Sequence, residues 1–330
     1  MILVLLLVLA LPACTGGPAS PARRAPILVV SDRGGALRVY EEAEGGGARL
    51  VGSPDASDPS HSDTMPARLP DRRVVFVSDR DGNPEIYLAA ADGRATRLTS
   101  DPPDRPAADS APAPLGRDRI VFARGEPGAP PGAPRDLYAM RLDGTGGTRL
   151  TRDPADDSAP SASADGRSIV FVSNRSGADR IYLIPDVEAA DAEATAVCLS
   201  DAEPTHTPPS DAGGVPSDSA PAFLPDGSIV FQRAPAGGGV PHLFVMGRSG
   251  TRAGLRQITD SRTLPFGAAE PVTLDTGEIL LDTGPVYDRA GRGGPTRFAV
   301  YRIALGGFNL TRMTRDRAAY RDYTRHLADR

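Results

Sequence analysis

The sequence Asp157-Ser158-Ala159-Pro160 decides the fold, because it returns along the chain. It recurs as Asp109-Ser110-Ala111-Pro112 and as Asp218-Ser219-Ala220-Pro221, and a looser copy reads Asp63-Thr64-Met65-Pro66. After each copy come a turn and an apolar run; these runs are Val74–Val77, Ile120–Ala123, Ile169–Val172 and Ile229–Phe231. A fixed order of elements that returns every ~40–50 residues is typical of a repeat architecture.

One repeat contains four short extended segments. After the opening phrase, Asp165-Gly166 predicts a tight turn, because glycine tolerates the positive φ that such turns need. The β-branched and aromatic stretch Ser168–Val172 predicts a second strand, and Asn174–Gly177 predicts a second turn. Arg180–Leu183 follows as a third strand, and Ala196–Ser200 closes the repeat.

Six such repeats predict a ring of sheets. A single four-stranded sheet cannot bury both of its faces, whereas several sheets stacked around an axis can. A β-sandwich is the alternative, but a sandwich does not repeat four strands in the same order. The second strands begin near Ile27, Val74, Ile120, Ile169, Ile229 and Ile279. The sequence therefore predicts an all-β protein, a six-bladed β-propeller of four-stranded antiparallel blades.

The first blade lacks its own opening phrase, since the chain enters it at the second-strand sequence Ile27–Val30. Near the other end of the chain, Asp322-Tyr323-Thr324-Arg325 stands where another opening phrase is due, with Arg325 at the proline position. We therefore expect the C-terminal segment to supply the innermost strand of the first blade. Such closure leaves no long open sheet edge.

The repeat resembles that of a known family. Val74–Ser78, Asp79–Asn83, Glu85–Leu88 and Arg97–Thr99 are similar to the TolB-type six-bladed propeller repeat. The resemblance covers nearly the whole chain after the leader and implies the fold, but propellers have many unrelated activities. The chain has no Trp, which the opening strand of that family usually carries, and no segment fits the α/β domain that precedes the propeller in TolB. The resemblance therefore implies a TolB-like propeller lipoprotein.

The N-terminus predicts export and lipidation. Residues 1–13 form an apolar run too short to span a bilayer, which fits a signal peptide. Leu11-Pro12-Ala13-Cys14 resembles the bacterial lipobox, so we expect lipidation of Cys14. Residues 14–25 are small, Pro- and Gly-rich and predict a tether, which leaves 26–330 for the propeller. The alternative for the leader is a buried strand or an uncleaved anchor.

Composition excludes several classes of function. The net charge of −5 argues against a nucleic-acid partner. The sequence contains no Gly-x-Ser-x-Gly motif and no Gly-rich phosphate loop that opens a helix. With Cys14 lipidated, Cys198 is the last thiol, and its apolar strand predicts a core residue. The four histidines lie at positions with no metal-binding spacing: His61, His206, His242 and His326.

The recurring aspartate is the strongest candidate for a site. It opens the innermost strand of each blade, so its copies should ring one mouth of the central channel; these are Asp63, Asp109, Asp157, Asp218 and Asp322. The last full blade has Ala268 instead, followed by Glu270-Pro271. We interpret the aspartates as architectural, each accepting backbone N–H groups and tying neighbouring blades together. The alternative is a cation or peptide site, since rings of oxygen ligands suit hard cations.

We expect a non-catalytic, lipid-anchored propeller of the bacterial cell envelope, facing the periplasm or the cell surface. As a monomer without a cofactor, it would bind an envelope protein, peptide or polymer through its channel mouth or its long loops, Gly125–Pro134 and Val187–Pro216. One alternative is a propeller enzyme of the lyase or lactonase type with a divalent cation in the axial channel. Another is a purely structural envelope protein.

Overall fold

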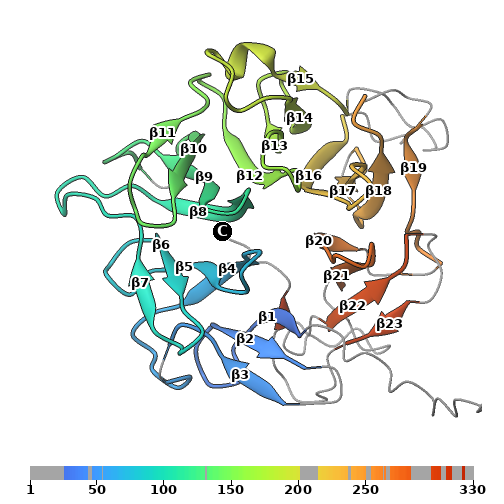
Figure 1. Ribbon diagram of the computed structural model, residues 1–330. Helices are drawn as coiled ribbons and strands as arrows, with labels where there is room; N and C mark the ends of the chain where they lie inside the picture. The colour runs from blue at the N-terminus through green and yellow to red at the C-terminus, as the bar shows by residue number, and fades with distance from the viewer. Residues whose placement is uncertain are drawn as a thin grey trace, which may run out of the picture.

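The computed structural model is a ring of six antiparallel sheets around a central axis (Figure 1). It describes residues 26–43, 47–53, 55–130, 132–200, 215–236, 239–249, 254–262, 264, 268–283, 299–305, 310–313 and 322–323. The expected signal peptide and tether, Cys14 included, lie outside these residues. The described residues contain no helix long and apolar enough to cross a membrane.

Each sheet is one blade with four strands, numbered here from the axis outward. Blade one is β24 (Asp322–Tyr323), β1 (Ile27–Ser31), β2 (Arg38–Glu42) and β3 (Ala48–Leu50); blade two is β4 (Asp63–Arg68), β5 (Val74–Ser78), β6 (Glu85–Ala89) and β7 (Ala95–Arg97); blade three is β8 (Asp109–Leu115), β9 (Arg119–Gly125), β10 (Arg135–Arg141) and β11 (Thr148–Arg149). Blade four is β12 (Asp157–Ala162), β13 (Ile169–Ser173), β14 (Arg180–Ile184) and β15 (Val197–Cys198); blade five is β16 (Ser217–Phe223), β17 (Ile229–Ala234), β18 (His242–Met246) and β19 (Arg256–Gln257); blade six is β20 (Ala269–Thr273), β21 (Ile279–Thr283), β22 (Ala299–Ile303) and β23 (Thr311–Arg312). This confirms the six-bladed propeller expected from the repeats.

The C-terminal strand closes the ring. β24 pairs antiparallel with β1, with Tyr323 opposite Val30 and Asp322 opposite Ser31. The innermost strand of blade one therefore comes from the end of the chain, while its other three strands come from the beginning. Opening the ring requires these two ends of the sequence to separate.

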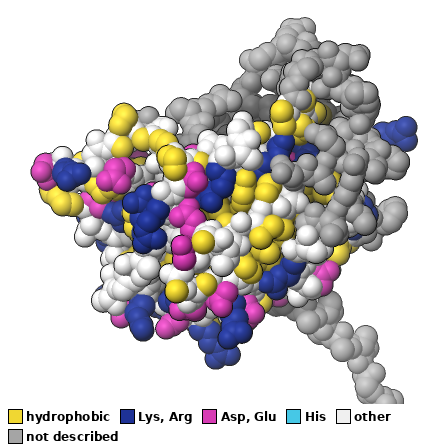
Figure 2. Space-filling model, turned by 90° about the horizontal axis from the view of Figure 1, so that it is seen from above, with side chains coloured by type: hydrophobic (Ala, Val, Ile, Leu, Met, Phe, Trp, Pro, Cys, Tyr) yellow, Lys and Arg dark blue, Asp and Glu magenta, His cyan; other side chains and the backbone are white. Residues whose placement is uncertain are grey.

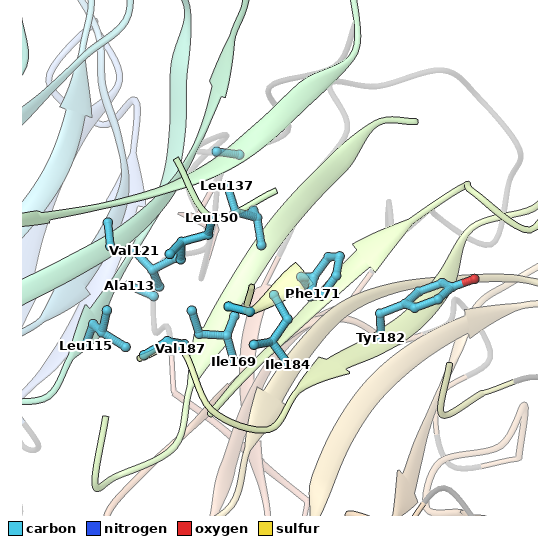
Figure 3. Packing of buried hydrophobic residues seen from close by; sticks show 13 residues of the cluster. Ala113, Leu115, Val121, Leu137, Leu150, Ile169, Phe171, Tyr182, Ile184 and Val187 are labelled. Carbon is cyan, nitrogen blue, oxygen red and sulfur yellow. The ribbon is translucent and has the colours of Figure 1, made fainter. Parts of the chain in front are cut away.

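The core is divided among the junctions between blades. One cluster of buried apolar side chains fills each junction, including the one between blades six and one, where Ile27 and Val29 meet Leu280 and Val300. In Figure 3 the side chains of blade three, such as Val121 and Leu137, lie beside those of blade four. Every blade is thus buried on both faces.

Burial on both faces explains the composition of the second strands. In β13, Ile169 and Phe171 point toward blade three, whereas Val170 and Val172 point toward blade five. Successive residues of a strand face opposite sides of the sheet, so a sheet covered on both sides requires apolar residues at every position. The apolar runs of the sequence are this requirement repeated in each blade.

The repeated phrase builds a β-bulge. The register of the innermost strand shifts between Ser158 and Ser161, and between the equivalent residues of the other described opening strands. Within the bulge, Ala159 has a φ of 46° and precedes Pro160. Proline donates no ladder hydrogen bond and is tolerated in a bulge. The left-handed residue recurs as Met65, Ala111, Ala220 and Glu270, with φ between 47° and 50°.

Hydroxyl groups close the outer side of the blades. The outermost strands have only two or three residues, so they leave the start of the third strand without a ladder partner. Thr151 Oγ1 accepts the backbone N–H of Leu137 at 2.9 Å, and the side chain of Thr151 is fully buried. Thr99, Ser200 and Thr259 accept the N–H groups of Ile86, Ile181 and Leu243 in the same way. This role explains the Thr or Ser that ends the repeats of blades two to five.

The ring has two faces of different construction. The face at which the innermost strands begin is called the aspartate face, and it carries the loops between second and third strands and between blades. The opposite face is called the turn face; it carries tight turns such as Leu69–Arg73 and Ser163–Ser168. Seen from the rim, side chains of both charge signs are interspersed over the described surface (Figure 2).

Candidate functional site

The recurring aspartates lie inside the protein at one end of the ring. Asp63, Asp109 and Asp157 open β4, β8 and β12, and Asp218 is the second residue of β16. Each of the four has at most 1% of its surface exposed. Asp322 occupies the same register in blade one, opposite Ser31; the position of its side chain is outside the described part of the structure. A carboxylate so deeply buried needs a charge partner or a proton.

Two aspartates have an arginine directly opposite on the second strand. Arg233 faces Asp218 in register and donates from Nε and Nη2 to its two oxygens at 2.5 and 2.8 Å. Arg233 Nη2 also donates to the carbonyl of Ser200 at 2.9 Å, which ties blade four to blade five. Arg124 faces Asp109, with 3.4 Å between Nη1 and Oδ2. The two ion pairs join the first and second strands of blades five and three at the aspartate face.

The other two aspartates receive an arginine from the turn after the second strand. Arg80 Nη2 donates to Asp63 Oδ1 at 2.8 Å, and Arg175 Nη2 donates to Asp157 Oδ2 at 2.7 Å. In blade two, Ser78 lies opposite Asp63, and its Oγ accepts a hydrogen bond from Arg80 Nε at 2.8 Å. The arginine also lies over the third-strand tyrosine, so Ser-x-Arg and Ile-Tyr work as one unit.

Blade one contains the same Ser-x-Arg unit. Arg33 Nε donates to Ser31 Oγ at 3.1 Å, and its guanidinium lies 4.7 Å from the centre of the Tyr40 ring. Ser31 is the residue that pairs with Asp322. The first strand pair therefore has the local construction that receives an aspartate in blades two and four.

The preceding blade adds a further charge at two junctions. Fully buried Arg38 begins β2, and its Nη1 donates to the carbonyls of Leu37 at 2.8 Å and His61 at 2.6 Å. Its Nε lies 3.8 Å from Asp63 Oδ2. Arg180 begins β14 in the same way, and its Nη1 lies 4.0 Å from Asp218 Oδ2. Each of these arginines donates a hydrogen bond to a backbone carbonyl of the segment that leads into the next blade, Arg38 to His61 and Arg180 to Pro216.

Two carboxyl groups meet at the junction of blades two and three. Fully buried Glu85 accepts the hydroxyl of Thr99 at 2.6 Å, and Arg97 Nη2 donates to it at 2.8 Å. Burial raises the pKa of Asp109 well above its usual range, and the charge of Glu85 adds to this, while a hydrogen bond from Thr99 opposes it. Burial at this junction therefore favours the uncharged form of Asp109.

Burial has the same effect at the next junction. It raises the pKa of Asp157, although hydrogen bonding to Ser173 and the charge of Arg175 oppose the change. Asp157 Oδ1, Asp109 Oδ1 and Asp63 Oδ2 are buried without a hydrogen-bond partner in the described part of the chain. Asp63, Asp109 and Asp157 thus each use one oxygen for an arginine, whereas Asp218 uses both.

The junction of blades five and six is different. Ala268 stands in the aspartate position and keeps only the backbone contact, donating its N–H to the carbonyl of Pro241 at 2.8 Å. His242 begins β18 there, and its Nε2 lies 3.1 Å from Ser261 Oγ. Burial lowers the pKa of His242, and the charge of Asp260 opposes this. A carboxylate is thus dispensable at this position of the repeat.

The histidines do not converge within the described residues. His61 Nε2 lies 3.7 Å from Asp63 Oδ2, and its Nδ1 lies 3.6 Å from Asp58 Oδ2. His206 and His326 are outside the described residues. Among the residues that the structure describes, no group of three or more His, Cys, Asp or Glu is arranged to hold a metal ion. Cys198 is a half-buried thiol in β15.

The two predicted loops differ in their surroundings. Gly125–Pro134 stands on the aspartate face between β9 and β10. The first part of the second loop instead packs into the junction of blades three and four, where Val187 and Ala192 are buried. Glu193 there accepts the N–H groups of Arg152 and Asp153 at 2.7 and 3.0 Å. This part stabilises the junction, and the rest of the loop, 201–214, lies outside the described residues.

Comparisons with known proteins identify the fold. No family model and no curated protein matches the sequence. Among solved structures, TolB from Acinetobacter baumannii is 17% identical over 93% of this chain and 67% of that one, with a TM-score of 0.63. The chain has a TolB-like propeller fold.

Other solved structures share this TolB-like fold. A putative TolB from Agrobacterium tumefaciens is 16% identical over 88% of both chains, with a TM-score of 0.55. The gluconolactonase XC5397 from Xanthomonas campestris is 15% identical over 81% of this chain and 95% of that one, with a TM-score of 0.52. At these identities the TolB-like architecture is what the likeness shows, since one fold serves many functions.

The arginine partners are the residues that sequence reasoning missed. They lie 15 residues after Asp109 and Asp218, 17 after Asp63 and 18 after Asp157. The signal was present as Ser-x-Arg in blades one, two and four and as an arginine near the end of the second strand in blades three and five. Both arrangements place a guanidinium beside the same carboxylate, which only the strand register reveals.

Proposed function

We propose that this protein is a non-catalytic, lipid-anchored propeller of the bacterial cell envelope that binds a protein, peptide or envelope polymer through the aspartate face. The observation that carries this proposal is the pairing of four axial aspartates with arginine. A cation or acid–base site at the mouth would use these same carboxyl groups, and each of the four already has an arginine side chain beside it. The likeness to two TolB structures supports the envelope location.

The loop Glu126–Pro134 is the described element best suited to contact a partner. It has nine residues, whereas the equivalent turn of blade four, Asn174–Asp179, has six. Its described residues are exposed or half-buried, and it stands on a rigid pair of strands. Loops of this kind carry function on a rigid scaffold.

Replacing this loop tests the proposal. Residues 126–134 are exchanged for the six residues of Asn174–Asp179, and the control exchanges the turn-face segment 142–147 for 90–94. Each chain is cross-linked in detergent-solubilised envelopes, and captured proteins and glycan are quantified by mass spectrometry. We expect one partner with wild type and control that is lost with the loop variant, at unchanged melting temperature. Equal recovery by all three chains would remove this loop from the binding surface.

The alternative is a propeller enzyme of the lyase or lactonase type with a divalent cation at the axial mouth. It is favoured by one pair of atoms, His61 Nε2 and Asp63 Oδ2, which lie 3.7 Å apart and are buried without hydrogen-bond partners in the described residues. Hydrolysis of aldonolactones with added Ca²⁺, Mn²⁺ or Zn²⁺ tests it. Metal-dependent turnover that His61→Ala abolishes would replace the binding proposal.

A further inference from the structure

The chain enters the propeller on the turn face. β1 begins at Ile27, and its other end, Ser31, lies on the aspartate face opposite Asp322. Pro26 therefore lies at the turn face, where its carbonyl accepts a hydrogen bond from Arg68 Nη2 at 3.2 Å.

The turn face beside this entry point is rich in arginine. Blades two and three carry six arginines at their turns, called here the arginine patch: Arg72, Arg73, Arg94, Arg117, Arg119 and Arg141. A shallow groove between the two blades is lined by Arg73, Arg117 and Arg141 together with Asp118, Leu142 and Asp143. The side chains of Arg94 and Arg141 are 90% and 61% exposed.

Carboxylates on the same turns are fewer, and most of them already accept hydrogen bonds from the backbone. Four aspartates lie on the same turns, and Glu188 of blade four pairs with Arg119 at 2.6 Å, so six arginines and five carboxylates leave a net charge of +1 on this part of a chain whose total is −5. The aspartates are Asp71, Asp92, Asp118 and Asp143. Three of them accept the backbone N–H two residues later, at 2.9 to 3.0 Å, as the turn requires. The fourth, Asp118, lies 3.9 Å from Arg141, and both side chains are exposed. Arg73 pairs with Asp71 at 2.7 Å. The arginines of the patch that are exposed to solvent are Arg72, Arg94, Arg117 and Arg141.

We propose that the turn face of blades two and three lies against an anionic lipid surface and that the aspartate face points away from it. The inference rests on the proposed lipid anchor. Eleven residues separate Cys14 from Pro26, and they span at most about 40 Å, so an anchor at Cys14 keeps the turn face near the bilayer. Guanidinium groups bind lipid phosphates through paired hydrogen bonds. The opposite face is thereby left free for a partner.

Sedimentation with vesicles tests the proposal. Residues 15–330, which contain all six blades, are mixed with vesicles of phosphatidylcholine with or without phosphatidylglycerol. Each arginine near an anionic surface strengthens binding about fivefold. The variant Arg72→Gln/Arg117→Gln/Arg141→Gln should therefore bind anionic vesicles about a hundredfold more weakly than wild type. The matched control, Arg105→Gln/Arg152→Gln/Arg262→Gln, removes three exposed arginines from the aspartate face and should bind like wild type.

Each outcome decides the question. Binding that needs phosphatidylglycerol, weakens with salt and is lost only in the turn-face variant supports the proposal. No binding by wild type, or equal loss in both variants, overturns it. Neither the lipid on Cys14 nor a protein partner takes part, so failure here leaves the loop-replacement test untouched. Labelling of the full chain with radioactive palmitate examines the anchor separately.

Discussion

Arg233→Met should destabilise the propeller by leaving a buried carboxylate unpaired. The side chains of Asp218 and Arg233 are 0% and 4% exposed, and two hydrogen bonds of 2.5 and 2.8 Å join them. Removing one partner of such a pair costs about 3–5 kcal/mol. Arg180, with its Nη1 4.0 Å from Asp218, compensates in part, so we expect about 3 kcal/mol.

Removing both charges should cost much less. Methionine preserves the apolar contact that Arg233 makes with the rings of Phe231 and Phe244. Blade six already carries Ala268 in the position of Asp218, so the fold tolerates an uncharged residue there. The double variant Asp218→Ala/Arg233→Met should therefore be more stable than Arg233→Met alone, although it carries one more substitution.

Urea unfolding followed by far-UV circular dichroism measures both effects. A domain of this size unfolds with an entropy of about 0.6 kcal/mol/K, so 3 kcal/mol corresponds to a fall of about 5 °C in melting temperature. Arg248→Met serves as the control, since this arginine lies over the Phe223 ring but outside the aspartate pairs. An Arg233→Met chain within 1 kcal/mol of wild type, or a double variant less stable than the single one, would refute the reasoning.

Three further predictions concern the ring and its junctions. Deleting residues 320–330 removes β24 and should lower the melting temperature sharply in calorimetry; an unchanged curve would contradict ring closure. Thr151→Val should cost about 1–3 kcal/mol in urea unfolding by orphaning the buried N–H of Leu137, whereas exposed Thr148→Val should cost little. Asp109→Asn should gain stability relative to wild type as pH rises above about 4, because the raised pKa makes ionisation in the folded state unfavourable. Urea unfolding at pH 5 and pH 8 checks this, and a pH-independent difference would contradict it.

The sequence predicted the parts of the fold that repeat locally. The phrase ending in Pro160 located the innermost strand, and the run Ile169–Val172 located a strand buried on both faces. Ring closure was predictable because Asp322 repeats the opening residue where blade one lacks it. The first two features depend on residues adjacent in sequence, and the third depends on a repeated residue, so the sequence pattern contains all three.

The pairing of the aspartates was not predictable in the same way. Arg124 and Arg80 reach equivalent carboxylates from different positions, one on a strand and one beyond its end. The partner becomes visible only when the strand register places Ser78 opposite Asp63. The insert at Val187 was misleading for a similar reason, since a polar, Ala-rich sequence does not reveal that two of its residues fill a junction.

The central claim is that the axial aspartates are architecture and that the protein is a binding propeller. Metal content of residues 15–330, measured by mass spectrometry before and after chelation with melting temperature alongside, tests it most directly. We predict no stoichiometric metal and the same melting temperature before and after chelation. One tightly held divalent ion per chain, with a melting temperature that falls when it is removed, would contradict the account and favour the enzyme.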